Sequence, residues 1–136
     1  MQMVCVNPDR VTVSPEGTLT YVPGQLGHRY AELGGEVVYF GKPYPAGFHK
    51  AIKTLGLPSD SVAHVGDSLD HDIKGANGVG IASVLVAATG VHAPELGCSM
   101  RTTFKELRAK QADLEALCHR KGETPTHVVP SFVWEP

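Results

Sequence analysis

The sequence predicts an α/β fold built on a parallel sheet. Three short, largely apolar runs have the length and composition of buried strands, namely Glu36–Phe40, Val62–Val65 and Ala82–Val86. Segments with helical spacing, each of roughly ten residues, separate these runs. Such alternation is typical of βαβ units, whose crossover connections are right-handed.

The residues before the first of these strands predict a strand and a hairpin. Val4–Val6 is a short apolar run, and Asn7-Pro8-Asp9 closes it with residues typical of turns. Val11–Val13 and Leu19–Val22 flank Ser14–Gly17, which has the composition of a hairpin tip.

Four segments predict helices. They are residues 25–33, which two glycines end, residues 45–55, residues 70–77, and a long helix from Thr103 to about Arg120. Thr103 and Glu106 have the spacing of a capping box, and Gly122 follows the end of that helix. Its expected packing face comprises Phe104, Leu107, Leu114, Leu117 and Cys118. The tail from Thr126 to Trp134 predicts an edge strand.

Composition and charge indicate a soluble globular protein. Of 136 residues, 42% are hydrophobic and 19% are charged, which fits a globular chain rather than a disordered one. The net charge of −2, without a basic cluster, argues against a nucleic-acid partner. Because no apolar stretch approaches ~20 residues, we expect no membrane span. Cys5, Cys98 and Cys118 lack zinc-site spacing, and we expect free thiols in a cytoplasmic, reducing compartment.

The strongest chemical signal lies directly after the predicted strand 62–65. Gly66 allows a sharp turn, which places Asp67 at the carboxyl edge of the sheet, where ligands bind in such folds. Together with Asp70 and Asp72, it suits a hard cation such as Mg²⁺. The alternative is a solvated turn in which Asp70 is a helix N-cap, and we favour this role for Asp70. His71, like the other histidines, is expected to be a structural or surface residue.

A second signal is Lys42, which follows the predicted strand 36–40 and would reach the same sheet edge as Asp67. A lysine beside a bound phosphate neutralises its charge, although Gly41-Lys42-Pro43 taken alone fits a surface lysine better. Asn7 and Asp9 are third candidates, as substrate contacts, although turn formation alone would explain them. Glycine-rich nucleotide-binding motifs and GxSxG are missing from the sequence.

In order and spacing, these motifs resemble those of haloacid dehalogenase-like (HAD) hydrolases. The matching segments are Asn7-Pro8-Asp9, Pro23-Gly24, Gly34-Gly35, Gly41-Lys42-Pro43, Gly66–Ser68 with Asp72, and Gly75–Asn77. The branch that the chain resembles is subfamily IIA, whose members carry a large α/β cap inserted in the core domain. The resemblance covers residue 3 to the end. It implies that residues 1–136 are the C-terminal part of a core domain, a Rossmann-like three-layer α/β/α parallel sheet without its N-terminal strand and cap.

The resemblance implies a Mg²⁺-dependent phosphatase that acts on a small phosphorylated metabolite. Family members attack the phosphate with an aspartate, and water then hydrolyses the aspartyl-phosphate. By resemblance, Lys42 would hold the phosphate and the nucleophile, and Asp67 would bind the metal. Asp72 would bind the metal through water or orient Lys42. Asn7 and Asp9 would lie close to the substrate.

The family's DxDGx nucleophile motif is missing from this sequence. We therefore expect no phosphatase activity from this polypeptide alone. We also expect an exposed apolar sheet edge through which the chain could self-associate. Three hypotheses follow: a fragment of a phosphatase, a noncatalytic HAD-like domain that binds phosphate or a protein partner, and an unrelated α/β module.

Overall fold

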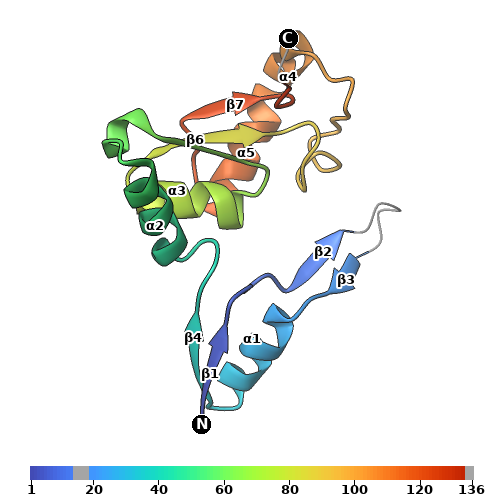
Figure 1. The fold of residues 1–136 in the computed structure, drawn as a ribbon. Coiled ribbons are helices and arrows are strands. Elements are labelled where there is room, and N and C mark those ends of the chain that lie inside the picture. The colour runs from blue at the N-terminus through green and yellow to red at the C-terminus, as the bar shows by residue number, and fades with distance from the viewer. Residues whose placement is uncertain (14–18, 134–136) are drawn as a thin grey trace.

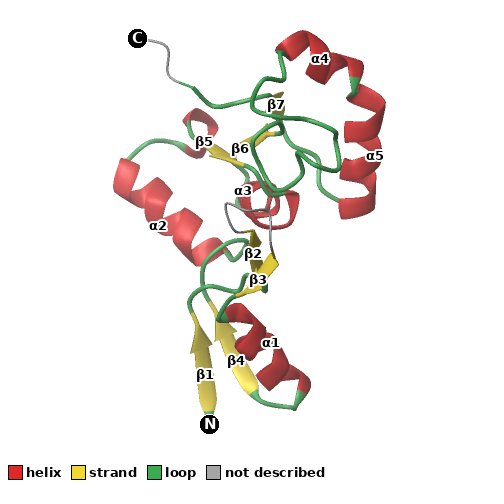
Figure 2. Cartoon of the chain, turned by 90° about the vertical axis from the view of Figure 1, so that its right-hand side faces the viewer, coloured by secondary structure: helices red, strands yellow, loops and turns green. Residues whose placement is uncertain are grey.

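The computed structural model describes residues 1–13 and 19–133, which form two lobes (Figure 1). The first lobe, residues 1–13 and 19–40, contains a parallel pair of strands, β1 (Gln2–Cys5) and β4 (Glu36–Tyr39). Helix α1 (Gly24–Glu32) packs on one face of this pair. A short hairpin of β2 (Val11–Val13) and β3 (Leu19–Tyr21) extends from it towards the second lobe (Figure 2). The predicted hairpin tip lies outside the described residues.

The second lobe, residues 45–133, is built on a three-stranded parallel sheet. Its strand order is β5-β6-β7, with bounds Ala63–Gly66, Ala82–Val86 and His127–Val129. Its helices are α2 (Pro45–Leu55), α3 (Lys74–Gly78), α4 (Phe104–Ala109) and α5 (Gln111–Lys121), with one 3₁₀ turn at Ser59–Ser61 and one π-helical turn at Leu69–Ile73. Every helix in the described part of the chain is too short to cross a lipid bilayer.

Two apolar clusters form the core of the second lobe. The larger joins the π-helical turn and β6 to α4 and α5 through Leu69, Ile73, Leu85, Leu107 and Leu117. The smaller lies between α2 and α3, and consists of Phe48, Ala76 and Ile81. Both clusters lie on helices and strands that flank the segment 66–72. The most completely buried side chains therefore support the turn that carries the predicted acids.

The α/β fold class with parallel strands is confirmed, but the parallel strands divide between two sheets instead of forming one. β4 and β5, expected as successive strands, belong to different sheets. The expected burial of residues 36–40 on both faces is also wrong, since Phe40 is 42% exposed. The reason is that α1 covers only one face of the β1–β4 pair. In agreement with this, Val4 and Val6 are exposed as well.

The long helix expected from Thr103 to about Arg120 is two helices. Lys110, between α4 and α5, has φ −99° and ψ 17°, which breaks the helical path. The capping box is confirmed, because the Thr103 hydroxyl accepts a hydrogen bond from the Glu106 amide. Phe104 is 61% exposed and so does not join the expected packing face. The edge strand in the tail is confirmed as β7, although Trp134 lies outside the described residues.

Candidate functional site

The Asp72 carboxylate is the centre of a buried hydrogen-bond network. Its Oδ1 atom accepts hydrogen bonds from Lys42 Nζ at 2.7 Å and from His64 Nε2 at 2.8 Å. Its Oδ2 atom accepts one from the Ser68 amide at 3.2 Å. Three segments thus converge on one side chain that is only 2% exposed: the loop after β4, strand β5 and the turn after β5.

Gly66 makes this arrangement possible. An added Cβ at Gly66 would lie 2.2 Å from Asp72 Cγ, inside any permitted contact distance. The carboxylate therefore rests directly against the backbone of β5, which only a residue without a side chain allows. The preference for glycine at position 66 is thus explained by a close approach as well as by a turn.

The surroundings of Asp72 favour its ionised form. Burial raises the pKa of Asp72, but the hydrogen bonds from His64 and Lys42 outweigh this effect and hold the pKa well below its ordinary value. The Lys42 side chain is half-exposed while Asp72 is enclosed, so the ion pair lies at the wall of a cavity. Lys42 contributes one hydrogen to Asp72, and its ammonium group retains two further donors.

The lowered pKa of Asp72 predicts a specific loss of stability in acid. Because the folded-state pKa lies below the unfolded value of about 3.9, the ionised carboxylate stabilises the fold above that pH, and this contribution disappears as the pH falls further. Urea unfolding of the wild type and of Asp72→Asn, measured from pH 7 to pH 3, should give free energies of unfolding whose difference shrinks below about pH 4. Asp60→Asn, at an exposed 3₁₀ turn, is the control and should run parallel to the wild type. Parallel curves for Asp72→Asn would contradict the account.

Asp67 directly follows β5, and the backbone of Gly90 approaches it closely. Its Oδ2 atom accepts a hydrogen bond from the Val91 amide at 3.0 Å. An added Cβ at Gly90 would lie 2.2 Å from Asp67 Cβ, so the loop after β6 approaches Asp67 closely. This loop and the turn after β5 hold the carboxylate at the carboxyl edge of the sheet, as the sequence predicts.

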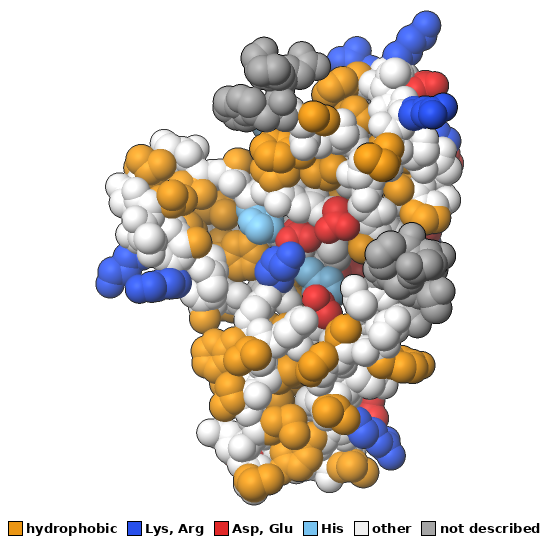
Figure 3. Space-filling view, turned by 45° about the vertical axis from the view of Figure 1, so that its right-hand side comes forward, with side chains coloured by type: hydrophobic (Ala, Val, Ile, Leu, Met, Phe, Trp, Pro, Cys, Tyr) orange, Lys and Arg blue, Asp and Glu red, His pale blue; other side chains and the backbone are white. Residues whose placement is uncertain are grey.

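Lys42, Asp67 and Asp72 line one cavity of about 520 Å³ between the two lobes, together with Asp9 and His71. Figure 3 shows charged and histidine side chains gathered in the middle of the molecule, with a largely hydrophobic surface on the first lobe below them. The sequence prediction that Lys42 and Asp67 reach the same region is confirmed, even though their preceding strands belong to different sheets.

The donor set of this cavity suits magnesium in part. Mg²⁺ takes one or two carboxylates and completes its octahedral shell with water and phosphate oxygens. Within residues 1–13 and 19–133, no group of three His, Cys, Asp or Glu side chains converges on one point. Asp67 fits the role of a single carboxylate ligand. Both oxygens of Asp72 already accept hydrogen bonds from protein groups, which favours its expected alternative role of orienting Lys42.

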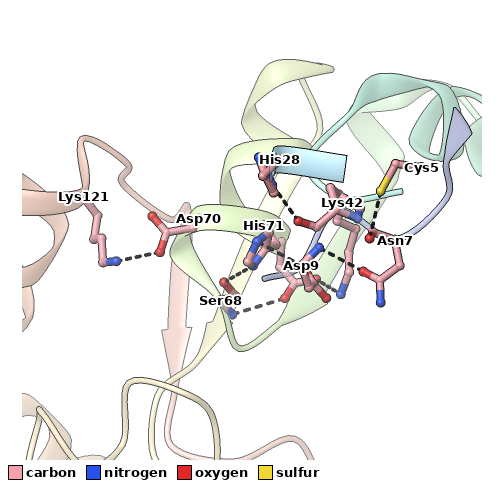
Figure 4. Close-up of polar contacts among 11 residues, drawn as sticks. Cys5, Asn7, Asp9, His28, Lys42, Ser68, Asp70, His71 and Lys121 are labelled. Atoms are coloured by element: carbon pink, nitrogen blue, oxygen red, sulfur yellow. Dashed lines mark hydrogen bonds and ion pairs between the residues drawn. The ribbon is translucent and has the colours of Figure 1, made fainter. Parts of the chain in front are cut away.

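A second polar chain crosses from one lobe to the other (Figure 4). His71 Nε2 lies 3.1 Å from Asp9 Oδ1, and His71 Nδ1 lies 3.0 Å from Ser68 Oγ. Asp9 therefore lies at the cavity, as expected of a residue near the substrate. Asn7 is not among the residues that line this cavity. Its side-chain oxygen accepts a hydrogen bond from the Asp9 amide at 3.1 Å. This contact supports the turn-forming role that the sequence left open for Asn7.

The roles of two histidines at the site were not anticipated from the sequence. His64 and His71, expected to be structural or surface residues, contact Asp72 and Asp9. His64 could have been found by its position two residues before Gly66, because alternate residues of a strand share a face. The N-cap role expected for Asp70 is wrong, since the turn begins after Ser68 and the Asp70 carboxylate pairs with Lys121 at 2.6 Å.

Comparison with known proteins identifies the class to which this fold and site belong. Residues 39–134 match the family model described as HAD-hydrolase-like. The chain therefore belongs to the HAD-like hydrolase family, as its motifs predict, and the hypothesis of an unrelated α/β module is excluded.

Individual relatives are phosphatases. Dihydroxyacetone phosphatase of Corynebacterium glutamicum is 34% identical over 85 residues, which is 62% of this chain and 31% of the relative. The structure of p-nitrophenyl phosphatase from Archaeoglobus fulgidus superposes with a TM-score of 0.71 at 27% identity, over 96% of this chain and 44% of that one. Glycerol phosphate phosphatase from Mycobacterium tuberculosis, solved in complex with magnesium, gives a TM-score of 0.56 at 32% identity, over 65% of this chain and 26% of that one. The chain thus spans about a third of the curated relative and less than half of either solved protein.

Proposed function

We propose that this chain carries the lysine and the metal-binding carboxylate of a Mg²⁺-dependent phosphatase that acts on a small phosphorylated metabolite. The observation that carries this proposal is the Lys42–Asp72 ion pair, at 2.7 Å, in the wall of the cavity that Asp67 also lines. The family membership and the relatives named as phosphatases of dihydroxyacetone and glycerol phosphate support it.

In this proposal Lys42 binds the phosphate group. Its ammonium holds one hydrogen bond to Asp72 and directs its other donors to phosphate oxygens, where the positive charge stabilises the charge of the transferring phosphoryl group. Asp72 holds the ammonium in place and stays ionised because its pKa is lowered. Asp9, linked to His71, contacts the substrate from the first lobe, with Asn7 behind it.

Asp67 is the carboxylate that would hold the metal, with Asp72 reaching it at most through water. Bound Mg²⁺ would neutralise phosphate oxygens and polarise the phosphoryl group. Asp67 is suited to this role because the Val91 amide fixes one of its oxygens at the cavity edge. Three free cysteines in the described residues agree with a reducing, cytoplasmic location, which is part of the proposal.

The proposal includes the expectation that the chain alone does not turn over substrate, because it contains no DxDGx nucleophile motif. Purified chain, incubated with p-nitrophenyl phosphate and Mg²⁺, should release no more nitrophenol than buffer does, while an alkaline phosphatase sample confirms that the assay works. Magnesium-dependent turnover that Asp67→Ala abolishes would overturn this expectation. An in-frame DxDGx sequence in the genomic DNA upstream of the Met1 codon would favour the fragment over a noncatalytic domain.

The exposed apolar face of the first lobe favours a second candidate function, that of a noncatalytic HAD-like domain that binds a protein partner or self-associates. Val4 on β1 is 59% exposed, and Val6 and Phe40, which directly follow β1 and β4, are 74% and 42% exposed; α1 covers this strand pair from one side only. Surfaces of this kind mark sites of association. Sedimentation of the purified chain over a range of concentrations measures self-association directly.

A further inference from the structure

His64 shares with Lys42 the same oxygen of Asp72. Its Nε2 atom lies 2.8 Å from Asp72 Oδ1, and Lys42 Nζ lies 2.7 Å from that oxygen. A carboxylate ion only accepts hydrogen bonds, so His64 Nε2 carries the hydrogen. His64 thus donates to the oxygen that holds the candidate phosphate-binding lysine.

The His64 ring is itself held in place. It belongs to strand β5, and it packs edge-on against Phe48 of α2, with ring centroids 5.0 Å apart and an interplanar angle of 70°. The His64 side chain is 28% exposed, whereas the Lys42 side chain is 49% exposed. A fixed donor on a strand and a long flexible lysine therefore meet at one oxygen, and the fixed donor determines where that oxygen lies.

We propose that His64 is a positioning residue, which acts through Asp72 to direct the Lys42 ammonium into the cavity beside Asp67. The inference rests on the proposed phosphate-binding role of Lys42 and deepens it. Without the His64 donor, Asp72 Oδ1 loses one of its two partners. The carboxylate is then held by Lys42 and the Ser68 amide alone, so the position of the Lys42 ammonium is fixed less closely. His64 is therefore two hydrogen bonds away from the Lys42 ammonium and acts on the phosphate only through it.

The first experiment reads the hydrogen bond in the wild-type chain. Long-range ¹⁵N–¹H correlation spectra report which ring nitrogen of each histidine carries hydrogen, and His64→Gln assigns the His64 signals. We expect hydrogen on Nε2 of His64. A ring with hydrogen only on Nδ1 would overturn the proposal, because the bond to Asp72 could not exist.

The second experiment measures the affinity for inorganic phosphate, with MgCl₂ present, by calorimetry. His64→Leu, which keeps the volume and removes the donor, should weaken phosphate binding by roughly tenfold, the scale seen when an outer-shell partner is lost. His64→Gln restores an N–H donor and should recover most of that loss. His49→Leu, an exposed histidine on α2, is the matched control and should bind as the wild type does.

Two results would contradict the positioning role: unchanged affinity in a folded His64→Leu chain, or equal loss in the Leu and Gln variants, which would assign the effect to packing on Phe48. Absence of phosphate binding by the wild type would instead contradict the proposed function.

If the wild type does not bind phosphate, the NMR signal of the Lys42 ammonium group still tests the positioning role of His64. It should be sharp and slowly exchanging in the wild type and in His64→Gln, and broadened in His64→Leu. A signal identical in all three chains would overturn the positioning role.

Discussion

Gly66→Ala is expected to lower the free energy of unfolding by about 2–3 kcal/mol, the upper part of the range of about 1–3 kcal/mol for overpacking a well-filled interior. The added methyl group would lie 2.2 Å from Asp72 Cγ and 2.6 Å from its Oδ1. Asp72 has no room to yield, because it is 2% exposed and three hydrogen bonds hold its carboxylate. The variant must therefore displace either β5 or the π-helical turn.

Urea unfolding monitored by circular dichroism measures this effect. The matched control is Gly78→Ala, at the end of α3, where an added Cβ meets nothing within 4 Å and the backbone does not require glycine. That variant should be neutral or more stable than the wild type by up to about 1 kcal/mol. Equal stabilities for the two alanine variants would show that Asp72 does not rest against Gly66 as described.

Local elements of the fold followed well from the sequence. Apolar runs bounded by turn residues located β4, β5 and β6, and the Thr103–Glu106 spacing located a real capping box. The division into two sheets did not follow, because strand pairing is a long-range property that apolar composition does not encode. The break at Lys110 did not follow either, since no glycine or proline marks it.

The candidate site was predictable to the extent that it depends on strand ends. Lys42 and Asp67 follow apolar strands, and that alone placed them at one cavity. The partners of these residues were harder to predict. His64 is a lone histidine on a strand, a pattern that core histidines share, and its contact with Asp72 depends on how closely the turn folds back on Gly66. The Asp9–His71 contact depends on how the two lobes approach each other.

The second large effect concerns Asp67 and the metal. We expect Asp67→Asn to weaken Mg²⁺ binding by more than about tenfold, because removal of an outer-shell partner alone costs about that much. Asparagine keeps an oxygen that accepts the hydrogen bond from the Val91 amide, so the loop after β6 should retain its position. The substitution removes only the negative charge that a hard cation requires.

The account is tested most directly by titrating the purified chain with MgCl₂ in the presence of inorganic phosphate while amide chemical shifts are recorded by NMR. The amides of Asp67 and Val91 and the region around Lys42 should shift in a saturable manner. The response should be lost in Asp67→Asn and kept in Asp60→Asn, whose aspartate lies at the 3₁₀ turn before β5. Equal responses in wild type and Asp67→Asn, or saturable shifts confined to residues outside this cavity, would contradict the assignment of Lys42 and Asp67 to a phosphate and magnesium site.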